Sequence, residues 1–278
     1  MRDYASAVID RVYGEYGVRY IKNDYNIDIG IGTEIRSDSF GDGLLEHCRA
    51  FILWVDEIKK KYPDLIWENC SSGGMRMDYA MLSISDLQST SDQTEYAITS
   101  HIAAAAATAV LPEQAAVWSY PIDSWVGGFA ATSEWANANV SDEQIIMNMI
   151  NSFLGRMHLA SHLELLNEEK FALVKEGVKY YNSIRAAKKK ALPYLPLGFT
   201  NFGNTLVASG LLTDERLYLA VWNLGGDKKV SIPLEGVAPK VAKVAYPACN
   251  TLEYKLVGNS IEIEFTEDYQ ARMLEIEL

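Results

Sequence analysis

The chain has 278 residues, of which 49% are hydrophobic and 22% charged, as in a globular protein with one large domain or two smaller ones. Its net charge of −12 argues against a nucleic-acid partner, because phosphate binding requires clustered Lys and Arg. No apolar run reaches the roughly 18 residues that a membrane span requires, so no membrane partner is predicted.

The cysteines and the first residues bear on location. Cys48, Cys70 and Cys249 have neither the spacing of a disulfide framework nor that of a zinc site, which favours a reducing compartment. The chain opens on a mixed charged and apolar segment rather than a secretory signal. A cytoplasmic location is therefore expected, with secretion of a longer parent protein left open.

Helices and strands alternate through the first two thirds of the chain. Apolar spacing predicts helices at residues 5–15, 43–61, 96–110, 142–153 and 168–187, with Ser141 and Gln144 as a capping box and Asn167 as an N-cap. Between them, strands are predicted at 18–23, 65–69, 86–90, 115–119 and 156–160. This alternation indicates an α/β fold with a parallel sheet. The basic run Lys188 to Lys190 is expected to be solvated.

The pattern changes after Pro193 and Pro196. From about residue 204 the chain shows short alternating runs such as "RLYLAVWNL" and "SIEIEF", with Gly225-Gly226 and Gly258-Asn259 as hairpin signals. We therefore expect two domains, residues 1–192 with the α/β pattern and residues 204–278 as a small antiparallel β domain. Trp222 is expected in the core of the second.

Polar side chains follow the first three predicted strands, at the ends where parallel α/β folds place their chemistry. They are Lys22, Asp24 and Asn26, then Glu68 to Gly74 with Arg76 and Asp78, then Ser91 and Asp92. Two facing carboxylates suit glycoside hydrolysis, with Asp24 as nucleophile, Asp92 as acid and then base, and Lys22 favouring the ionised form of Asp24. Alternatively, both aspartates are helix N-caps, as Asp often is after a strand.

The strings "YIKNDYN", "ENCSSGGMRMD" and "STSDQTE" resemble the three successive active-site segments of the family 36 glycoside hydrolases, the α-galactosidases. The resemblance implies a partial (β/α)8 barrel, about strands four to eight, over residues 1 to about 190, followed by a C-terminal β-sandwich. It implies a retaining double displacement that removes terminal α-galactosyl residues from oligosaccharides of the raffinose and melibiose type.

The same resemblance implies roles for individual residues. Asp24 would be the nucleophile and Asp92 the acid and base, with carboxyl groups about 5–5.5 Å apart. Lys22 would bind a sugar hydroxyl, and Cys70 and the backbone of Gly73 would line the sugar. Asn26 and Arg76 match further motif positions. A galacto-oligosaccharide is the expected partner, and neither a metal nor a cofactor is implied.

Several positions depart from the family pattern. Asn23, Tyr25 and Ile27 stand where many members carry Trp, Met and Arg, and Ser72 and Met75 stand where glycines are usual. Sugar specificity therefore stays open, and an α-N-acetylgalactosaminidase or a galactosyltransferase of the same family is an alternative.

The chain begins just before what would be the fourth barrel strand. We therefore expect the C-terminal portion of a longer enzyme, with little or no turnover alone, because five strands cannot close a barrel of eight. The other alternative is an inactive fragment or oligosaccharide-binding remnant. A homo-oligomer is left open, and a nucleotide enzyme is disfavoured because no phosphate loop is present.

Other side chains near the predicted site have competing interpretations. His158 and His162 are four residues apart but lack a third ligand, so no metal site is predicted. Glu68 is a candidate partner of Lys22 or of Arg76. Trp118 and Tyr120 are candidates for stacking on a sugar or for core packing, and Trp125 and Trp135, in a loop-rich stretch at the same face, are candidates for contact with the leaving group.

Overall fold

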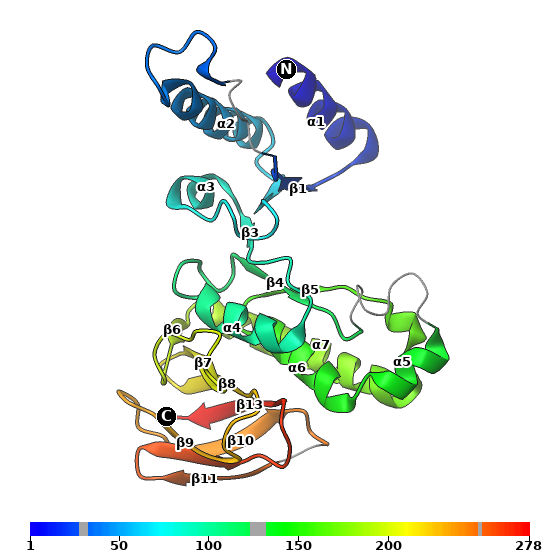
Figure 1. Ribbon diagram of the computed structural model, residues 1–278, viewed down its shortest axis with the longest axis vertical. Helices are drawn as coiled ribbons and strands as arrows, with labels where there is room; N and C mark the ends of the chain where they lie inside the picture. The colour runs from blue at the N-terminus through cyan, green and yellow to red at the C-terminus, as the bar shows by residue number, and fades with distance from the viewer. Residues whose placement is uncertain (28–32, 123–131, 250–251) are drawn as a thin grey trace. The chain divides into compact units, whose positions relative to one another are not determined.

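The computed structural model describes residues 1–27, 33–122, 132–249 and 252–278. The described residues form two compact units, Met1–Thr90 and Ser91–Leu278, and Figure 1 labels most of their elements. Parallel strands alternate with helices in the N-terminal two thirds, and antiparallel sheets fill the last third, which confirms a mixed α/β fold. The division into residues 1–192 and 204–278 remains a prediction.

The first unit is a parallel β-sheet segment with helices between its strands. In chain order its elements are α1 (Arg2–Tyr16), β1 (Tyr20–Asp24), α2 (Asp42–Lys61), β2 (Ile66–Cys70), α3 (Tyr79–Ile84) and β3 (Leu87–Ser89). Strand β2 pairs in parallel with both β1 and β3. The register sets Lys22 opposite Glu68 and Asp24 opposite Cys70. The predicted parallel pairing is confirmed, with strand ends shifted by one or two residues.

Local sequence explains where these helices begin and end. Helix α1 ends where Gly17 takes a left-handed conformation, at φ 70°, and donates its N–H to the carbonyl of Val12. Helix α3, which the sequence did not predict, begins because the Asp78 carboxylate accepts hydrogen bonds from the N–H groups of Ala80 and Met81. Asp78 of the second motif is therefore a helix cap.

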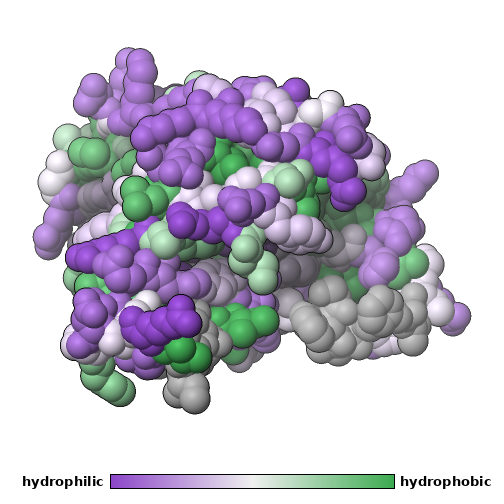
Figure 2. All heavy atoms as spheres, turned by 90° about the horizontal axis from the view of Figure 1, so that it is seen from above, coloured by the Kyte–Doolittle hydropathy of each residue, from purple (hydrophilic) through white to green (hydrophobic). Residues whose placement is uncertain are grey.

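The core of the first unit is small. Ile9 from α1, Val55 and Ile58 from α2, and Leu65 and Trp67 at β2 are its buried members. The predicted apolar stripe of α2 is buried only in its C-terminal half, because Leu44 and Leu45 are 46% and 48% exposed. Figure 2 shows one face of the molecule, which is mostly hydrophilic with hydrophobic residues scattered over it.

The second unit opens with helices around a pair of parallel strands. Its elements are α4 (Tyr96–Ala106), β4 (Ala115–Ser119), α5 (Ser133–Asn139), α6 (Asp142–Phe153), β5 (Arg156–Leu159), the 3₁₀ helix η3 (Leu163–Leu165) and α7 (Glu168–Lys188). Strands β4 and β5 pair in parallel. Ser141 and Asn167 are confirmed as N-caps, because Ser141 Oγ accepts from the Gln144 N–H at 3.1 Å and Asn167 Oδ1 from the Lys170 N–H at 2.9 Å. The reciprocal bond from the Gln144 side chain, which a full capping box requires, remains a prediction.

Helix α5 was not predicted. Trp135, a candidate for contact with the leaving group, lies on this helix rather than in a loop and packs against the main core cluster of this unit. Trp125 lies outside the described residues. Helix α6 is the centre of the cluster, with every residue from Ile145 to Phe153 buried.

Antiparallel strands complete the second unit. They are β6 (Leu192–Tyr194), β7 (Leu206–Leu212), β8 (Arg216–Asn223), β9 (Lys229–Pro233), β10 (Val241–Tyr246), β11 (Glu253–Val257), β12 (Ser260–Glu264) and β13 (Gln270–Glu277). One sheet has the order β10-β13-β8-β7-β6 and the other β11-β12-β9. Both sheets supply residues to one apolar cluster, for example Leu219 and Ile261.

Two turn signals and one core prediction can be compared with these sheets. Gly258-Asn259 joins β11 and β12 as a two-residue hairpin, with Val257 opposite Ser260, as predicted. The hairpin prediction at Gly225-Gly226 is wrong, because that turn carries the chain from β8 in one sheet to β9 in the other. Trp222 is fully buried, as predicted, and its Nε1 donates to Asn151 Oδ1 at 2.8 Å.

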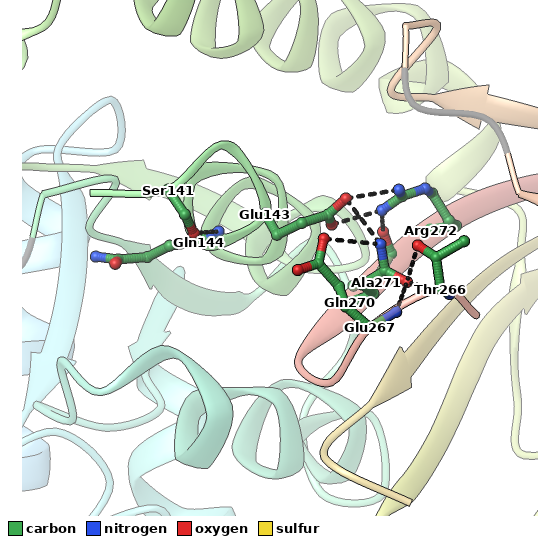
Figure 3. A network of polar contacts seen from close by, with 8 residues as sticks. All are labelled: Ser141, Glu143, Gln144, Thr266, Glu267, Gln270, Ala271 and Arg272. Carbon is green, nitrogen blue, oxygen red and sulfur yellow. Dashed lines mark hydrogen bonds and ion pairs between the residues drawn. The ribbon is translucent and has the colours of Figure 1, made fainter. Parts of the chain in front are cut away.

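One ion pair joins helix α6 to strand β13 (Figure 3). Arg272 is buried, and its two terminal nitrogens each lie 2.7 Å from a carboxylate oxygen of Glu143. Gln270 Nε2 donates to the same carboxylate at 3.1 Å. Because a buried guanidinium needs a counterion, this bidentate contact fixes the C-terminal strand against the helix.

Lys188 contradicts the expectation of a solvated basic run. Its side chain is buried, and Nζ donates to the carbonyls of Phe153, at 2.6 Å, and of Gly155. The ring of Tyr181 lies 4.3 Å from the same nitrogen. Burial lowers the pKa of Lys188 to about 7. Lys189 and Lys190 are exposed, as expected.

The low pKa of Lys188 predicts a pH-dependent stability. Between pH 7 and pH 10.5 the unfolded chain binds this proton and the folded chain does not, so stability rises with pH in that window. The gain is about 2 kcal/mol between pH 7 and pH 9. Denaturant titrations at both pH values should show that Lys188→Met removes this gain, while Lys189→Met keeps it. An equal gain in both variants would contradict the assignment.

No helix within the described ranges is long and apolar enough to cross a membrane.

Candidate active site

The end of β1 and the turn after β2 form one hydrogen-bonded structure. Tyr25 donates its N–H to the carbonyl of Cys70 at 2.9 Å, which extends the β1–β2 ladder. The N–H of Ser72 lies 2.6 Å from Asn26 Oδ1 and 3.4 Å from Asp24 Oδ1. Asp24 and Asn26 are both exposed. The two predicted side chains therefore share one backbone donor at an open strand end.

Backbone conformation at the second motif explains its glycines. Ser72 and Gly73 both have left-handed φ angles, 44° and 80°, and the Ser71 N–H closes the turn on the Gly73 carbonyl at 3.1 Å. A Cβ at Gly74 would lie 2.7 Å from the carbonyl oxygen of Thr90. The tight turn, with no room for a side chain at position 74, aims the Ser72 N–H at the end of β1.

Lys22 is paired with a buried carboxylate on the neighbouring strand. Its Nζ lies 3.5 Å from Glu68 Oε1, and Glu68 has no exposed surface. The same carboxylate accepts hydrogen bonds from Ser89 Oγ, at 2.6 Å, and from the Tyr20 hydroxyl. The candidate pairing of Glu68 with Lys22 is confirmed. Nothing in the motif pattern indicates that Tyr20 and Ser89 contact Glu68.

Cys70 is enclosed at the base of this site. Burial raises the pKa of its thiol, and the Gly73 backbone, Ser89, Lys22 and Asp24 are the groups that act on it. The thiol is therefore held neutral beside the carboxylate of Asp24. A neutral thiol there is a weak hydrogen-bond donor rather than a nucleophile.

Arg76 is held against Tyr25 in two ways. Its Nε donates to the Tyr25 carbonyl at 3.0 Å, and the guanidinium lies 4.1 Å from the centre of the Tyr25 ring. Burial raises the pKa of the Tyr25 phenol, whose hydroxyl lies 2.6 Å from His47 Nε2 on α2. Tyr25 thus anchors the motif to that helix. The motif spacing gave no sign of His47.

The third motif continues from Ser91 into the second unit, where its polar side chains organise the start of α4. Ser91 Oγ accepts the Gln93 N–H at 3.0 Å, and Gln93 Oε1 accepts the N–H groups of Thr94 and Glu95. The Glu95 carboxylate caps α4. Asp92 is exposed and does not cap the helix.

The capping alternative is wrong for both aspartates. Among the described residues, the next α-helix after Asp24 is α2, and its N-cap is Gly41. The site residues of the first unit, Lys22, Asp24, Asn26, Cys70, Gly73 and Arg76, lie on two neighbouring strand ends. The pairing of Asp24 with Asp92 remains a prediction.

Aromatic side chains gather at the ends of β4 and β5. Trp118 stacks on Tyr120, with ring centres 5.6 Å apart, and meets the edge of His158 at 5.1 Å. Trp118 and Tyr120 are each partly buried. His162 pairs with Glu164 at 2.9 Å. In the part of the chain that the structure describes, no group of three His, Cys, Asp or Glu side chains could hold a metal.

The family model described as Melibiase matches residues 1–190. The chain belongs to the melibiase family of glycoside hydrolase family 36 α-galactosidases. A search of curated proteins finds no match to this melibiase-family chain.

Solved structures share the fold of this melibiase-family chain. The galactosidase domain of the α-galactosidase–sucrose kinase AgaSK matches 100% of it at 18% identity, with a TM-score of 0.75. The α-galactosidase AgaA from Geobacillus stearothermophilus matches 99% of the chain at 17% identity, with a TM-score of 0.77. The α-galactosidase from Lactobacillus brevis matches 99% of the chain at 16% identity, with a TM-score of 0.73. The chain spans 37% of the AgaSK domain chain and 38% of each of the other two.

Proposed function

We propose that this chain supplies the catalytic carboxylates of a retaining α-galactosidase. The observation that carries the proposal is the exposed Asp24, which shares the Ser72 N–H with Asn26. Asp24 also lies beside Cys70 and two residues after Lys22, which pairs with Glu68. Membership of the melibiase family supports glycosidase chemistry at this position. The partial (β/α)8 barrel and the C-terminal β-sandwich are the fold in which we place it.

The proposed chemistry proceeds in two displacements. The Asp24 carboxylate attacks the anomeric carbon while Asp92 gives its proton to the departing glycosidic oxygen, and a covalent galactosyl ester forms at Asp24. Asp92, now ionised, takes a proton from water, and the resulting hydroxide breaks the ester at the same carbon. Two inversions leave the configuration unchanged.

The remaining site residues would bind the sugar. Lys22 and Asn26 offer a cationic donor and an amide at the exposed strand end, and Cys70 and the Gly73 backbone lie beneath it. Arg76, held on Tyr25, lies at the margin of the same turn. Related AgaA variants have been solved with 1-deoxygalactonojirimycin, raffinose and stachyose, which supports a galacto-oligosaccharide as the partner.

Retention of configuration is the direct test of this function. The assay uses the completed enzyme, meaning this chain supplied with the portion of the family fold that it does not span. We expect it to cleave aryl α-galactosides and to release galactose first as the α-anomer. A time course of NMR spectra measures which anomer appears first. Initial release of β-galactose would contradict the retaining mechanism, and absence of cleavage would contradict the function. For the chain alone we expect little or no turnover.

A cytoplasmic location remains a prediction from cysteine usage. The relatives named above are all α-galactosidases, and no observation favours an α-N-acetylgalactosaminidase or a galactosyltransferase.

A further inference from the structure

We propose that Glu68 is a positioning residue that holds the ammonium group of Lys22 in place for the sugar. The proposal rests on the function proposed above, in which Lys22 binds a sugar hydroxyl. Glu68 itself has no exposed surface, so it acts through Lys22 rather than on a ligand.

The strand register places the participants on one face of the sheet. Lys22 on β1 is directly opposite Glu68 on β2, and Glu68 is opposite Leu87 on β3. Tyr20 is two residues before Lys22 on β1, and Ser89 is two residues after Leu87 on β3. Residues two apart in a strand point to the same face of the sheet. The side chains of Tyr20, Lys22 and Ser89 therefore converge on Glu68, and all three contact its carboxylate.

Charge explains why Lys22 stays near this carboxylate. A buried carboxylate is costly unless it is hydrogen-bonded and paired with a cation. Ser89 and Tyr20 supply neutral donors to Glu68, and Lys22 supplies a positive charge. The Lys22 side chain is 29% exposed, so part of it lies at the open strand end while Nζ contacts the buried carboxylate. An ammonium has three donors, which suits it to bridging two acceptors.

The same contacts extend to Cys70. Ser89 donates to Glu68 and also acts on the Cys70 thiol, and the charge of Lys22 acts on that thiol as well. Removal of the Glu68 charge should therefore disturb two of the predicted sugar-contacting side chains, while leaving the backbone of β1 and β2 intact.

A double-mutant cycle in the completed enzyme tests the proposal. Glu68→Gln keeps the shape and removes the charge, and Lys22→Met removes the ammonium. We expect each to weaken galactose binding about ten- to a hundredfold, and the double variant to be no weaker than the worse single one, because both act through one contact. Tyr20→Phe, which leaves the charge pair intact, should change affinity less than either.

Glu46→Gln is the matched control, since Glu46 also forms an ion pair, with Arg49 at 2.8 Å, but on the surface of α2. It should leave affinity unchanged. If Glu68 is purely structural, Glu68→Gln will lower the melting temperature without changing galactose affinity in the folded enzyme, or its effect will add to that of Lys22→Met. Either result overturns the proposal.

A second measurement on the chain itself separates this proposal from the proposed function. The NMR signal of the Lys22 side-chain amine is identified by its loss in Lys22→Met. Without any sugar, Glu68→Gln should move it to the position of a solvated lysine and speed its hydrogen exchange, and Glu46→Gln should not. An unmoved signal overturns the positioning role. If the signal moves but the completed enzyme does not bind galactose, positioning stands and the proposed function fails.

Discussion

Azide is expected to give opposite anomers of galactosyl azide with the two carboxylate variants of the completed enzyme. With Asp92→Ala and an activated aryl galactoside, the leaving group needs no proton, so the ester at Asp24 still forms. Azide then attacks that ester and gives the retained product, α-galactosyl azide. Natural galactosides, which need the acid, should be cleaved about 10²–10⁴-fold more slowly.

With Asp24→Gly, the ester cannot form, and turnover of aryl and natural galactosides should fall by roughly 10⁴-fold or more. Azide fits the space that the carboxylate leaves and attacks the substrate from that face. One inversion gives β-galactosyl azide. NMR of the isolated products distinguishes the two anomers through the coupling of the anomeric proton.

Asp78→Ala is the matched control, because Asp78 belongs to the same motif region but caps helix α3. It should cost about 1 kcal/mol of stability and yield no azide product. The same azide anomer from Asp24→Gly and Asp92→Ala would require the roles of nucleophile and acid to be reassigned.

Glu143→Ala is expected to destabilise the chain by about 3–5 kcal/mol. The substitution leaves the Arg272 guanidinium buried without its counterion, which is costlier than losing the attraction alone. Glu143→Gln, which keeps an acceptor, should cost less. The free energy of unfolding from denaturant titration measures both.

The control for this pair is Glu277→Ala. Glu277 lies 3.7 Å from Arg216, and its side chain is 57% exposed, so its loss should cost less than about 1 kcal/mol. The double variant Glu143→Leu with Arg272→Met should recover most of the stability, since it removes both charges together. A cost for Glu143→Ala as small as that for Glu277→Ala would show that the buried pair contributes little.

Several features of this protein follow from sequence because their causes are local. Ser141 and Asn167 bond the backbone within three residues, so a short window predicts them as caps. Alternating strands and helices predict parallel pairing, because a crossover helix returns the chain in the same direction. The polar residues at the ends of β1 and β2 then belong to one site, and the structure brings them together.

Other features depend on partners that are distant in the chain. Glu143 reads as an acidic residue in the first turn of a helix, and only the packing of β13 against α6 makes it the counterion of Arg272, 129 residues away. Lys188 reads as part of a solvated basic run, and only the position of the Phe153 and Gly155 carbonyls buries its amine.

The role of Glu68 lies between these two cases. Its sequence position marks it as a strand-end carboxylate, so a cationic partner could be expected. Glu68 pairs with Lys22 because the register of β1 against β2 sets Lys22 directly opposite it. Arg76, the other candidate partner, is held on Tyr25 instead. Sequence determines which side chains a strand end carries, and tertiary structure decides which of them meet, because register and burial are set by contacts between segments far apart in the chain.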